Sequence, residues 1–386
     1  MSRIDELIRD LCPNGVEVKT LGEVGEFIRG NGLQKADLRD AGFPAVHYGQ
    51  IHTHYGVWAT KTKSFTDENI AVKLRHARPG DLLIATTSED DDAVAKATAW
   101  LGDTDVAVSG DAYIYRHELE PKYVSYFFQS TSFQDQKRRF ISGTKVRRVS
   151  GDSLAKIRIP VPPLEVQREI VRVLDQFTQL EAELEAELEA RRRQYEHYQR
   201  ALLAVGSSVE NVPMGEIAAI GTGRTDRKDA TVDGAFPLYV RSKDVLASDR
   251  WEFDETAIII PGEGGIGEIF HFAAGKYALH QRAYRVAPHD TRILPRFLYF
   301  YLRESFGDYV RQRAVTATVT SLRRSMLTDF PVPLLPLEEQ TRVVETLDQL
   351  DALINDIRVG LPAELAARRK QYEYYRDKLL TFTEAA

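Results

Sequence analysis

A thirteen-residue segment occurs twice in this chain of 386 residues, as RRRQYEHYQRALL at 191–203 and as RRKQYEYYRDKLL at 368–380. The similarity extends upstream, where IPVPPLEVQREIVRVLDQ (159–176) matches VPLLPLEEQTRVVETLDQ (332–349) at a separation of 173 residues. Similarity on this scale predicts an internal duplication, in which a block and a helix are followed by a second block and a second helix.

The blocks that precede the helices match less closely. Residues 21–44 correspond to residues 214–237 at a separation of 193, so the first block is about twenty residues longer in its middle. The two copies keep similar helices but differ in the middle of their blocks. This contrast indicates a shared scaffold whose two blocks bind different targets.

Residues 165–203 have the composition of one long helix. They contain no Pro or Gly, and the helix-favouring residues Ala, Leu, Glu, Arg and Gln dominate. Apolar residues recur mostly every three or four positions, as they do in the second copy, which is the pattern of a coiled-coil seam. Each copy therefore predicts a helix of about 40 residues, roughly 60 Å long.

The second copy has four extra residues between its Leu-Asp-Gln and Gln-Tyr-Glu motifs. Four residues add about one turn, so the seam stays aligned while the helix lengthens by about 6 Å. Gly360, Leu361 and Pro362 interrupt this helix, and Pro362 suits the start of a restarted one. Such a seam also fits a homodimer, but two copies in one chain can pair with each other. We therefore expect an antiparallel coiled coil that sets the separation of two heads, with an approximate two-fold axis.

The charge distribution follows this division. The net charge is −6, and the acidic excess lies entirely in the two helical segments, whereas each head is neutral overall. Within the first head, residues 121–158 carry nine Lys and Arg against Asp135 and Asp152. Because the binding of a polyanion depends on the charge of the local surface rather than on the net charge of the protein, the heads remain compatible with nucleic-acid binding. The predicted domains are a first head 1–158, a central helical segment 159–206, a second head 207–330 and a C-terminal helical segment 331–386.

Each head mixes short β-rich tracts with one helix near its end, which predicts an α+β chain with two α/β heads and mixed sheets. The helices are expected at 120–140 and 292–313. Strands are expected in tracts 16–24, 43–49, 80–87, 105–110 and 112–117 of the first head, and in 236–242, 256–262, 267–273 and 283–287 of the second.

The sequence lacks familiar catalytic motifs, including the Asn/Asp-Pro-Pro-aromatic tetrapeptide, GxxxxGK[ST], HExxH and GxSxG. The single cysteine, Cys12, excludes an internal disulfide and a multi-cysteine zinc site, and the nine histidines lack ligand spacing. SEDDD at 88–92 is expected to be an exposed acidic loop, with a metal site as the alternative. PGEGGIGEIF at 261–270 is expected to be a tight turn between strands, with a contact to DNA phosphate as the alternative. No apolar run approaches the roughly 18 residues of a membrane span, which favours the cytoplasm.

In both heads, basic and hydrogen-bonding residues alternate with aromatic ones. Lys and Arg neutralise phosphates and bind guanine, Gln binds adenine, and Ser and Thr contact the DNA backbone. An isolated exposed Lys or Arg is usually only solvated, but these tracts recur at matched places, such as GTKVRR (143–148) and TATVTS (316–321). The predicted DNA-binding residues are Tyr48, Gln50, His52, His54, Tyr55, Lys61, Lys63, Thr144, Lys145, Arg147 and Arg148 in the first head, and Arg224, Arg227, Lys228, Arg241, Ser242, Lys243, Gln281, Arg282, Thr318, Thr320, Ser321, Arg323 and Arg324 in the second.

These motifs together resemble the specificity subunit of type I restriction-modification systems. The resemblance rests on the two proline-rich PLxxQ segments, each followed by a long helix that ends in QYExY, and on the opening SRIDELIRDLCPNGVEVKTLGEV. It implies that each head is a target recognition domain for one half of a split, asymmetric double-stranded DNA site. It also implies that the helices set the half-site spacing and dock two methyltransferase subunits.

The resemblance implies no cofactor and no catalysis in this chain. S-adenosylmethionine belongs to the methyltransferase subunits, and ATP and Mg²⁺ for restriction belong to restriction subunits, two of which can complete the complex. A bacterial or archaeal host follows. The alternative is a DNA-specificity module that serves a stand-alone methyltransferase or another nuclease. The residues predicted for helix pairing and partner contact are Gln167, Leu174, Arg192, Tyr195, Tyr198, Gln340, Leu347, Arg369, Tyr372 and Tyr375.

Overall fold

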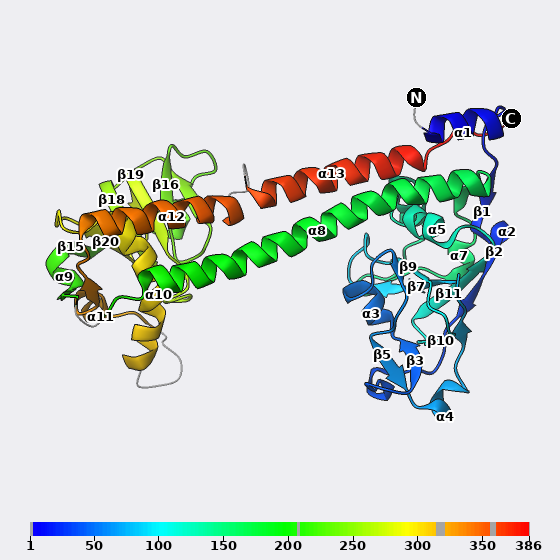
Figure 1. Cartoon of the computed structure of the whole chain (residues 1–386), viewed down its shortest axis with the longest axis horizontal. Coiled ribbons are helices and arrows are strands. Elements are labelled where there is room, and N and C mark those ends of the chain that lie inside the picture. The colour runs from blue at the N-terminus through cyan, green and yellow to red at the C-terminus, as the bar shows by residue number, and fades with distance from the viewer. Residues whose placement is uncertain (1–2, 207–208, 314–320, 356–359, 386) are drawn as a thin grey trace. The chain divides into compact units, whose positions relative to one another are not determined.

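The structure, a computed structural model, describes residues 3–206, 209–313, 321–355 and 360–385. It divides into two compact units (Figure 1). The first unit comprises Met1–Glu183 with Leu365–Ala386, and the second comprises Leu184–Glu364. Each unit therefore contains one head together with parts of the long helices.

The first unit contains two mixed sheets. A five-stranded sheet has the order β2-β11-β7-β9-β4, and a four-stranded sheet has the order β5-β3-β10-β6. Strands β3 and β10, and strands β4 and β9, run parallel, whereas the other neighbours are antiparallel. The mixed sheet predicted for this head is confirmed. The strands are β1 (Val18–Thr20), β2 (Gly25–Arg29), β3 (Phe43–Val46), β4 (Trp58–Ala59), β5 (Ser64–Thr66), β6 (His76–Ala77), β7 (Leu82–Ala85), β8 (Thr87–Ser88), β9 (Ala97–Trp100), β10 (Val106–Val108), β11 (Ala112–His117), β12 (Arg147–Arg148) and β13 (Arg158–Pro160).

Short helices join these strands. Two of them replace the single helix predicted at 120–140, which was wrong. Ser130 separates the two, because its hydroxyl donates to the carbonyl of Phe127 and accepts from the nitrogen of Phe133, capping the second helix. The helices are α1 (Arg3–Leu11), α2 (Leu21–Val24), α3 (Tyr48–Thr53), α4 (Glu68–Ala71), α5 (Pro121–Phe127), α6 (Thr131–Arg138), α7 (Gly151–Leu154) and the 3₁₀ helix η1 (Lys35–Asp37).

The tract 16–24 also departs from the prediction of one strand. It contains β1 and then the helical turn α2, which precedes β2. Glu23 causes the interruption, since its carboxylate accepts from both the backbone nitrogen and the hydroxyl of Thr20 in a capping box.

The second unit contains one six-stranded sheet of order β15-β20-β18-β19-β16-β17, in which β16 and β19 are parallel and the other neighbours antiparallel. Its predicted helix is confirmed as the continuous α10 (Pro295–Arg313). The other elements are β14 (Asn211–Pro213), α9 (Met214–Ile217), β15 (Ala218–Thr222), the 3₁₀ helix η2 (Arg227–Asp229), β16 (Phe236–Tyr239), β17 (Val245–Ser248), β18 (Phe253–Pro261), β19 (His271–Leu279), β20 (Ala283–Pro288), α11 (Arg324–Thr328) and β21 (Pro331–Pro333).

The segment 261–270 connects β18 to β19, as expected of a turn between strands. Gly264, Gly265 and Gly267 adopt positive φ angles of 65°, 78° and 77°, which side chains other than glycine rarely tolerate. The strand predicted at 267–273 therefore begins only at His271.

The predicted long helix is confirmed as α8 (Leu164–Leu203). The second copy contains α12 (Leu337–Asn355) and α13 (Leu361–Leu379), and α13 restarts at the predicted Leu-Pro pair. The four-residue difference in length falls between the Leu-Asp-Gln and Gln-Tyr-Glu motifs, an interval that includes residues 356–359, which lie outside the described part of the chain.

Helix pairing is visible within each unit. In the first unit, α8 and α13 lie side by side (Figure 1). Phe177 of α8 stacks on Tyr375 of α13 at 5.4 Å, and Glu181 pairs with Arg369 at 2.6 Å. Residue numbers rise along α8 as they fall along α13, so the two helices are antiparallel there. In the second unit, Leu188 and Tyr195 of α8 share a core with residues of α12.

A matched glutamine fastens the helices to each head. Gln167 is 3% exposed, and its side chain accepts from the nitrogen of Glu120 and donates to the carbonyl of Pro162. Gln340 is fully buried, accepts from the nitrogen of Leu294 and donates to two backbone carbonyls. The repeated PLxxQ motif thus fixes the start of each long helix against the head beside it.

In each copy, a matched aspartate further along the same long helix makes a second contact with the head. Asp175 accepts from Lys122 at 2.7 Å and from the hydroxyl of Tyr126 at 2.8 Å. Its counterpart Asp348 accepts from Arg296 at 2.7 Å. The Leu-Asp-Gln motif of each copy therefore binds a helix of the adjacent head, which is α5 in the first unit and α10 in the second.

Candidate nucleic-acid interface

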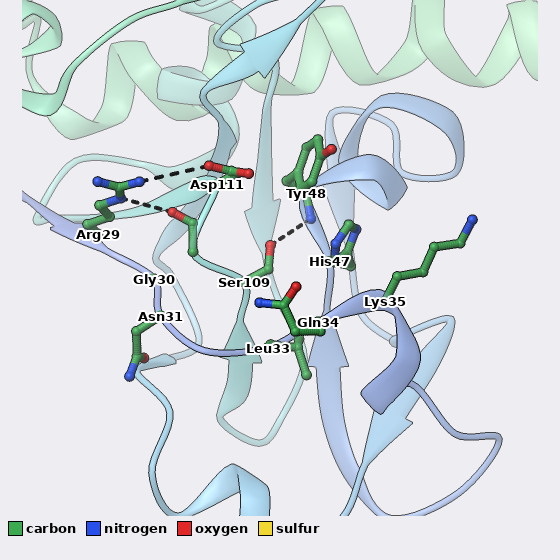
Figure 2. A pocket seen from close by; sticks show the side chains of 11 residues that line it. Arg29, Gly30, Asn31, Leu33, Gln34, Lys35, His47, Tyr48, Ser109 and Asp111 are labelled. Atoms are coloured by element: carbon green, nitrogen blue, oxygen red, sulfur yellow. Dashed lines mark hydrogen bonds and ion pairs between the residues drawn. The ribbon is translucent and has the colours of Figure 1, made fainter.

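Three loops of the first head surround an open pocket of about 590 Å³ (Figure 2). They follow β2, follow β3 and join β10 to β11. Together they place cationic, amide, hydroxyl and carboxylate groups around one polar hollow. The lining residues are Arg29, Gly30, Asn31, Leu33, Gln34, Lys35, His47, Tyr48, Ser109, Gly110 and Asp111.

Hydrogen bonds fix these loops against each other. The Arg29 guanidinium donates to the carbonyl of Gly110 at 2.9 Å and lies 3.8 Å from the carboxylate of Asp111. The backbone nitrogen of Tyr48 donates to the hydroxyl of Ser109 at 2.8 Å (Figure 2). Partial burial lowers the pKa of His47, so its ring is neutral near pH 7; its Nδ1 accepts from the nitrogen of Gly49 at 3.3 Å, which leaves Nε2 as a donor.

A smaller pocket of about 260 Å³ shares Arg29 and Asp111 with the first and reaches the loop at 142–150. Arg148 lines it from β12, which pairs with β8. Because the two pockets share Arg29 and Asp111, they form one continuous lining that extends from Tyr48 to Arg148 of the basic tract 143–148.

The basic tract forms a tight loop. Gly143 has a φ of 90°, and the backbones of Ser142 and Arg148 are joined by two hydrogen bonds of 2.9 Å. Thr144, Lys145 and Arg148 are exposed. Arg147 instead pairs with Asp91 of the acidic loop at 2.7 Å.

Other predicted residues of the first head occupy different environments. Tyr55 is only 5% exposed and accepts from the nitrogen of Lys63, so it supports the loop from within. Gln50 donates to Ser64 at 2.7 Å, and a ring nitrogen of His52 lies 2.9 Å from the carbonyl of Thr87. His54, Lys61 and Lys63 are exposed.

In the second head, hydrogen bonds join the loops that carry the predicted residues. Gln281 donates from its backbone to the carbonyl of Thr225 at 3.0 Å and from its side chain to Asp226 at 3.1 Å. The nitrogen of His280 donates to the carbonyl of Tyr239, which places the loop after β16 beside them. The loops after β15, after β16 and between β19 and β20 therefore converge.

Arg241 and Arg282 meet on one carboxylate at this convergence. Glu263 accepts from Arg241 at 2.8 Å and from Arg282 at 3.0 Å. A ring nitrogen of His271 lies 3.0 Å from the carbonyl of Ser242, which holds the same loop. The remaining cations predicted for these three loops, Arg224, Arg227, Lys228 and Lys243, are exposed.

The segment 321–324 adjoins this surface, because the nitrogen of Leu322 donates to the carbonyl of Gly262 at 2.8 Å. Ser321, Arg323 and Arg324 are exposed there. Thr318 and Thr320, also predicted to bind DNA, lie outside the described residues.

The same framework underlies both surfaces. Parallel pairing joins Ala45 to Ala107 in the first head and Leu238 to Ala278 in the second. A Cβ atom on Gly30 would collide with the carbonyl of Ser109, and one on Gly223 with the carbonyl of Leu279, so both loops need glycine at their start.

This equivalence reveals residues that the sequence-based prediction missed. Arg224, Arg227 and Lys228 of the second head were predicted to bind DNA, whereas their counterparts at the separation of 193, Asn31, Gln34 and Lys35, were not. Applying that separation would have found much of the first-head pocket. The missed residues are Arg29, Asn31, Gln34, Lys35, His47, Ser109 and Asp111.

Most residues predicted for helix pairing lie inside the units. Leu174 and Leu347 are fully buried, and Tyr195 lies in the second unit's core. Tyr372 donates to Gln129 at 2.9 Å within the first unit. Arg192 and Tyr198 are exposed on α8.

The acidic loop 88–92 makes structural contacts with its basic neighbours. Besides the Arg147 pair, the fully buried Lys137 donates to the carbonyls of Asp92 and Val94 at 3.0 and 2.9 Å. Among the described residues, no group of three or more His, Cys, Asp or Glu could hold a metal ion. Nor does any helix in that part of the chain have the length and apolarity to cross a membrane.

The family model for the type I restriction modification DNA specificity domain matches residues 13–190 and again residues 206–367. The specificity subunit of the type I restriction enzyme EcoR124I/EcoR124II from Escherichia coli is 34% identical over 294 residues, covering 68% of this chain and 70% of that one. A type I restriction enzyme specificity subunit from Haemophilus influenzae is 30% identical over 269 residues, covering 63% and 69%.

Solved structures show the same fold. The S subunit of the type I restriction-modification system from M. genitalium superposes with a TM-score of 0.60 at 16% identity, covering 95% of this chain and 96% of that one. A chain from a study of complex assembly and conformational transition in the type I R-M system gives 0.61 at 18% identity, covering 96% and 98%. With two matched copies of its domain, this chain belongs to the type I restriction modification DNA specificity family.

Proposed function

We propose that the two heads recognise two different half-sites of one bipartite, asymmetric double-stranded DNA sequence. The observation that carries this proposal is a contrast at matched positions. The two heads share a loop framework, yet the first presents Tyr48 and Asp111 where the second presents Arg241 and Arg282. As a type I specificity subunit, the chain is the non-catalytic DNA-recognition part of its complex.

The chemistry of the loops suits DNA recognition. Exposed Lys and Arg neutralise phosphates and position the duplex, whereas Arg, Gln and carboxylate groups select base edges in the major groove. In the first head, Lys145 and Arg148 suit phosphate, and the pocket around Asp111 suits base edges. In the second, Arg224, Arg227 and Lys228 suit phosphate.

We further propose that the long helices dock two methyltransferase subunits, which supply S-adenosylmethionine and the methyl transfer. Restriction subunits that use ATP and Mg²⁺ join the same assembly. Two features support this division of labour: the acidic excess of the helical segments, which disfavours DNA, and the near-repetition of the helices, which offers similar faces twice. Exposed Arg192 and Tyr198 lie on such a face.

The decisive experiment expresses the chain with its methyltransferase partners in a host that lacks adenine methylation. Single-molecule sequencing should then show methylated adenines within one bipartite motif. Omitting this chain should abolish that methylation while leaving the methyltransferase subunits soluble. Methylation of the same motif without this chain would overturn the proposal.

The matched controls are variants in one head only. Substituting Arg241 and Arg282 should change the second half-site, and substituting Asp111 should change the other. If either variant altered both half-sites equally, the assignment of one half-site to each head would fail. Pairing with a stand-alone methyltransferase or another nuclease is not favoured by the comparisons, and co-purification with a type I methyltransferase subunit distinguishes these alternatives.

A further inference from the structure

We propose that Arg241 and Arg282 of the second head read guanine in the major groove, and that Glu263 is the positioning residue that orients both guanidinium groups. The inference rests on the proposed DNA-recognition function and assigns a base to one of its half-sites. It goes beyond phosphate binding, for which a carboxylate between two arginines is unfavourable.

The three side chains come from three separate loops. Arg241 follows β16, Glu263 follows β18, and Arg282 lies between β19 and β20. One oxygen of Glu263 accepts from both arginines, at 2.8 Å from Arg241 and 3.0 Å from Arg282. The side chains of Arg241 and Arg282 remain 45% and 58% exposed, so unused donors face solvent. The bond from Arg282, followed by its charge and that of Arg241, lowers the pKa of Glu263, which stays ionised.

The backbone beneath the cluster is well anchored. The nitrogen of Gly262 donates to the carbonyl of Arg282 at 2.8 Å, which ties the Glu263 loop to the Arg282 loop. The nitrogen of Arg282 donates to the ring of His280 at 2.9 Å. The arginines therefore need little ordering before DNA arrives, which favours selective contacts over adaptable ones.

Guanine is the base that such a cluster suits. An arginine fork donates two parallel hydrogen bonds to the O6 and N7 acceptors of guanine, and no other base offers that pair in the major groove. A carboxylate that holds one edge of the fork fixes the direction of the other edge. Two arginines on one carboxylate also keep a net positive charge, so the cluster still attracts DNA.

The first head lacks this arrangement. Tyr48 and Asp111 occupy the matched positions, and Asp111 lies near Arg29 at 3.8 Å. A requirement for guanine from this mechanism should therefore appear only in the half-site of the second head.

The test uses the full chain in complex with its methyltransferase subunits and a duplex library with one randomised half-site at a time. The variants are Arg282→Lys, Arg241→Lys, Glu263→Gln and the control Glu268→Gln. Glu268 is exposed in the same glycine-rich segment and has no role in the cluster. Lysine keeps the positive charge but loses the fork, so each lysine variant should lose about 10- to 100-fold of its discrimination for guanine at one base pair.

Glu263→Gln should weaken the discrimination for guanine by about tenfold and leave the selectivity for the other half-site unchanged. Glu263→Asp, which keeps the carboxylate, should retain part of the discrimination for guanine. If Glu263 had a purely structural role, Glu263→Gln would lower the thermal midpoint of the protein and would weaken binding to all DNA sequences equally. The inference is overturned if the lysine variants keep the guanine preference, or if Glu263→Gln behaves as Glu268→Gln. If the wild-type complex selects no bipartite sequence, the proposed function itself fails, and these two failures are therefore distinguishable.

Discussion

The side-chain carbonyl of Gln167 accepts a hydrogen bond from the backbone nitrogen of Glu120 at 2.9 Å. The acceptor lies at the start of a long helix, and the donor precedes the head helix α5, 47 residues earlier in the chain. Gln340 makes the same kind of contact in the second unit, with Leu294 at 2.8 Å. One side chain in each unit therefore couples the position of the head to the long helix.

Replacement of these glutamines should destabilise the unit that contains them. Gln167→Ala leaves the nitrogen of Glu120 and the carbonyl of Pro162 buried without their partner, at a cost of about 1–3 kcal/mol. Urea unfolding, followed by hydrogen exchange at Glu120, measures this effect. Gln371→Ala, at an exposed position of α13, should stay within about 0.5 kcal/mol of wild type. Equal stability of the two variants would contradict the assignment.

The basic loop of the first head should contribute to the salt dependence of DNA binding. The triple variant of Lys145, Arg147 and Arg148 to alanine should bind DNA more weakly. Each lost phosphate contact lowers the slope of log affinity against log salt by about 0.9. Most of the change should come from Lys145 and Arg148, because Asp91 already pairs with Arg147. Titrations at several salt concentrations measure the slope, and Arg9→Ala on α1 is the control for the loss of one positive charge away from this loop. An unchanged slope would remove this loop from the interface.

The stability of the first unit should rise with pH in the range governed by Lys137. Burial lowers the pKa of Lys137 from its ordinary value of 10.5 to about 8. Between these two values the unfolded chain binds more protons, so the free energy of unfolding increases with pH by at most about 1.4 kcal/mol per unit. The difference in stability between wild type and Lys137→Met should therefore change only from about pH 8 to 10.5. The exposed substitution Lys145→Met serves as the control, and parallel curves for wild type and Lys137→Met would refute the assignment.

The length of the second helical copy should determine the spacing between the half-sites. Deletion of residues 356–359, which lie outside the described part, makes the copy as long as the first between its two motifs. Methylation mapping should then find the same half-site bases at a different separation. Replacement of these four residues by alanine keeps the length and should keep the spacing. If the deletion also kept the spacing, this segment would not act as a ruler.

The sequence predicted the long helices correctly, because their signals lie in the local composition and repeat over many residues. The 40-residue helix α8, the restart of α13 and the continuous α10 all follow from composition and breakers. It failed at 120–140, because the Ser130 cap depends on two backbone contacts that helix periodicity does not encode. The family resemblance is confirmed by the matched domain, because that signal extends over both copies.

The candidate interface was harder to predict, because a pattern of residue types does not show which side of a loop faces solvent. Tyr55 follows the exposed His54 directly in the sequence but is buried beneath the loop. Gln167 and Gln340 stood in a repeated motif, and their burial becomes visible only with the head packed against the helix. Arg29 and Asp111 carried no conspicuous local motif, and the pocket that joins them depends on the pairing of distant strands.

The close approach of Gly30 to Ser109, and of Gly223 to Leu279, defines where the specificity of such a chain can be redesigned. Neither glycine tolerates a side chain, whereas Gln34 and Lys35 after the first glycine, and Arg224, Arg227 and Lys228 after the second, are exposed. A combinatorial library should therefore keep the two glycines invariant and vary these five exposed positions, leaving the buried Leu33 unchanged. Most members of that library would then fold, and the search would be confined to sequences that differ in what they bind.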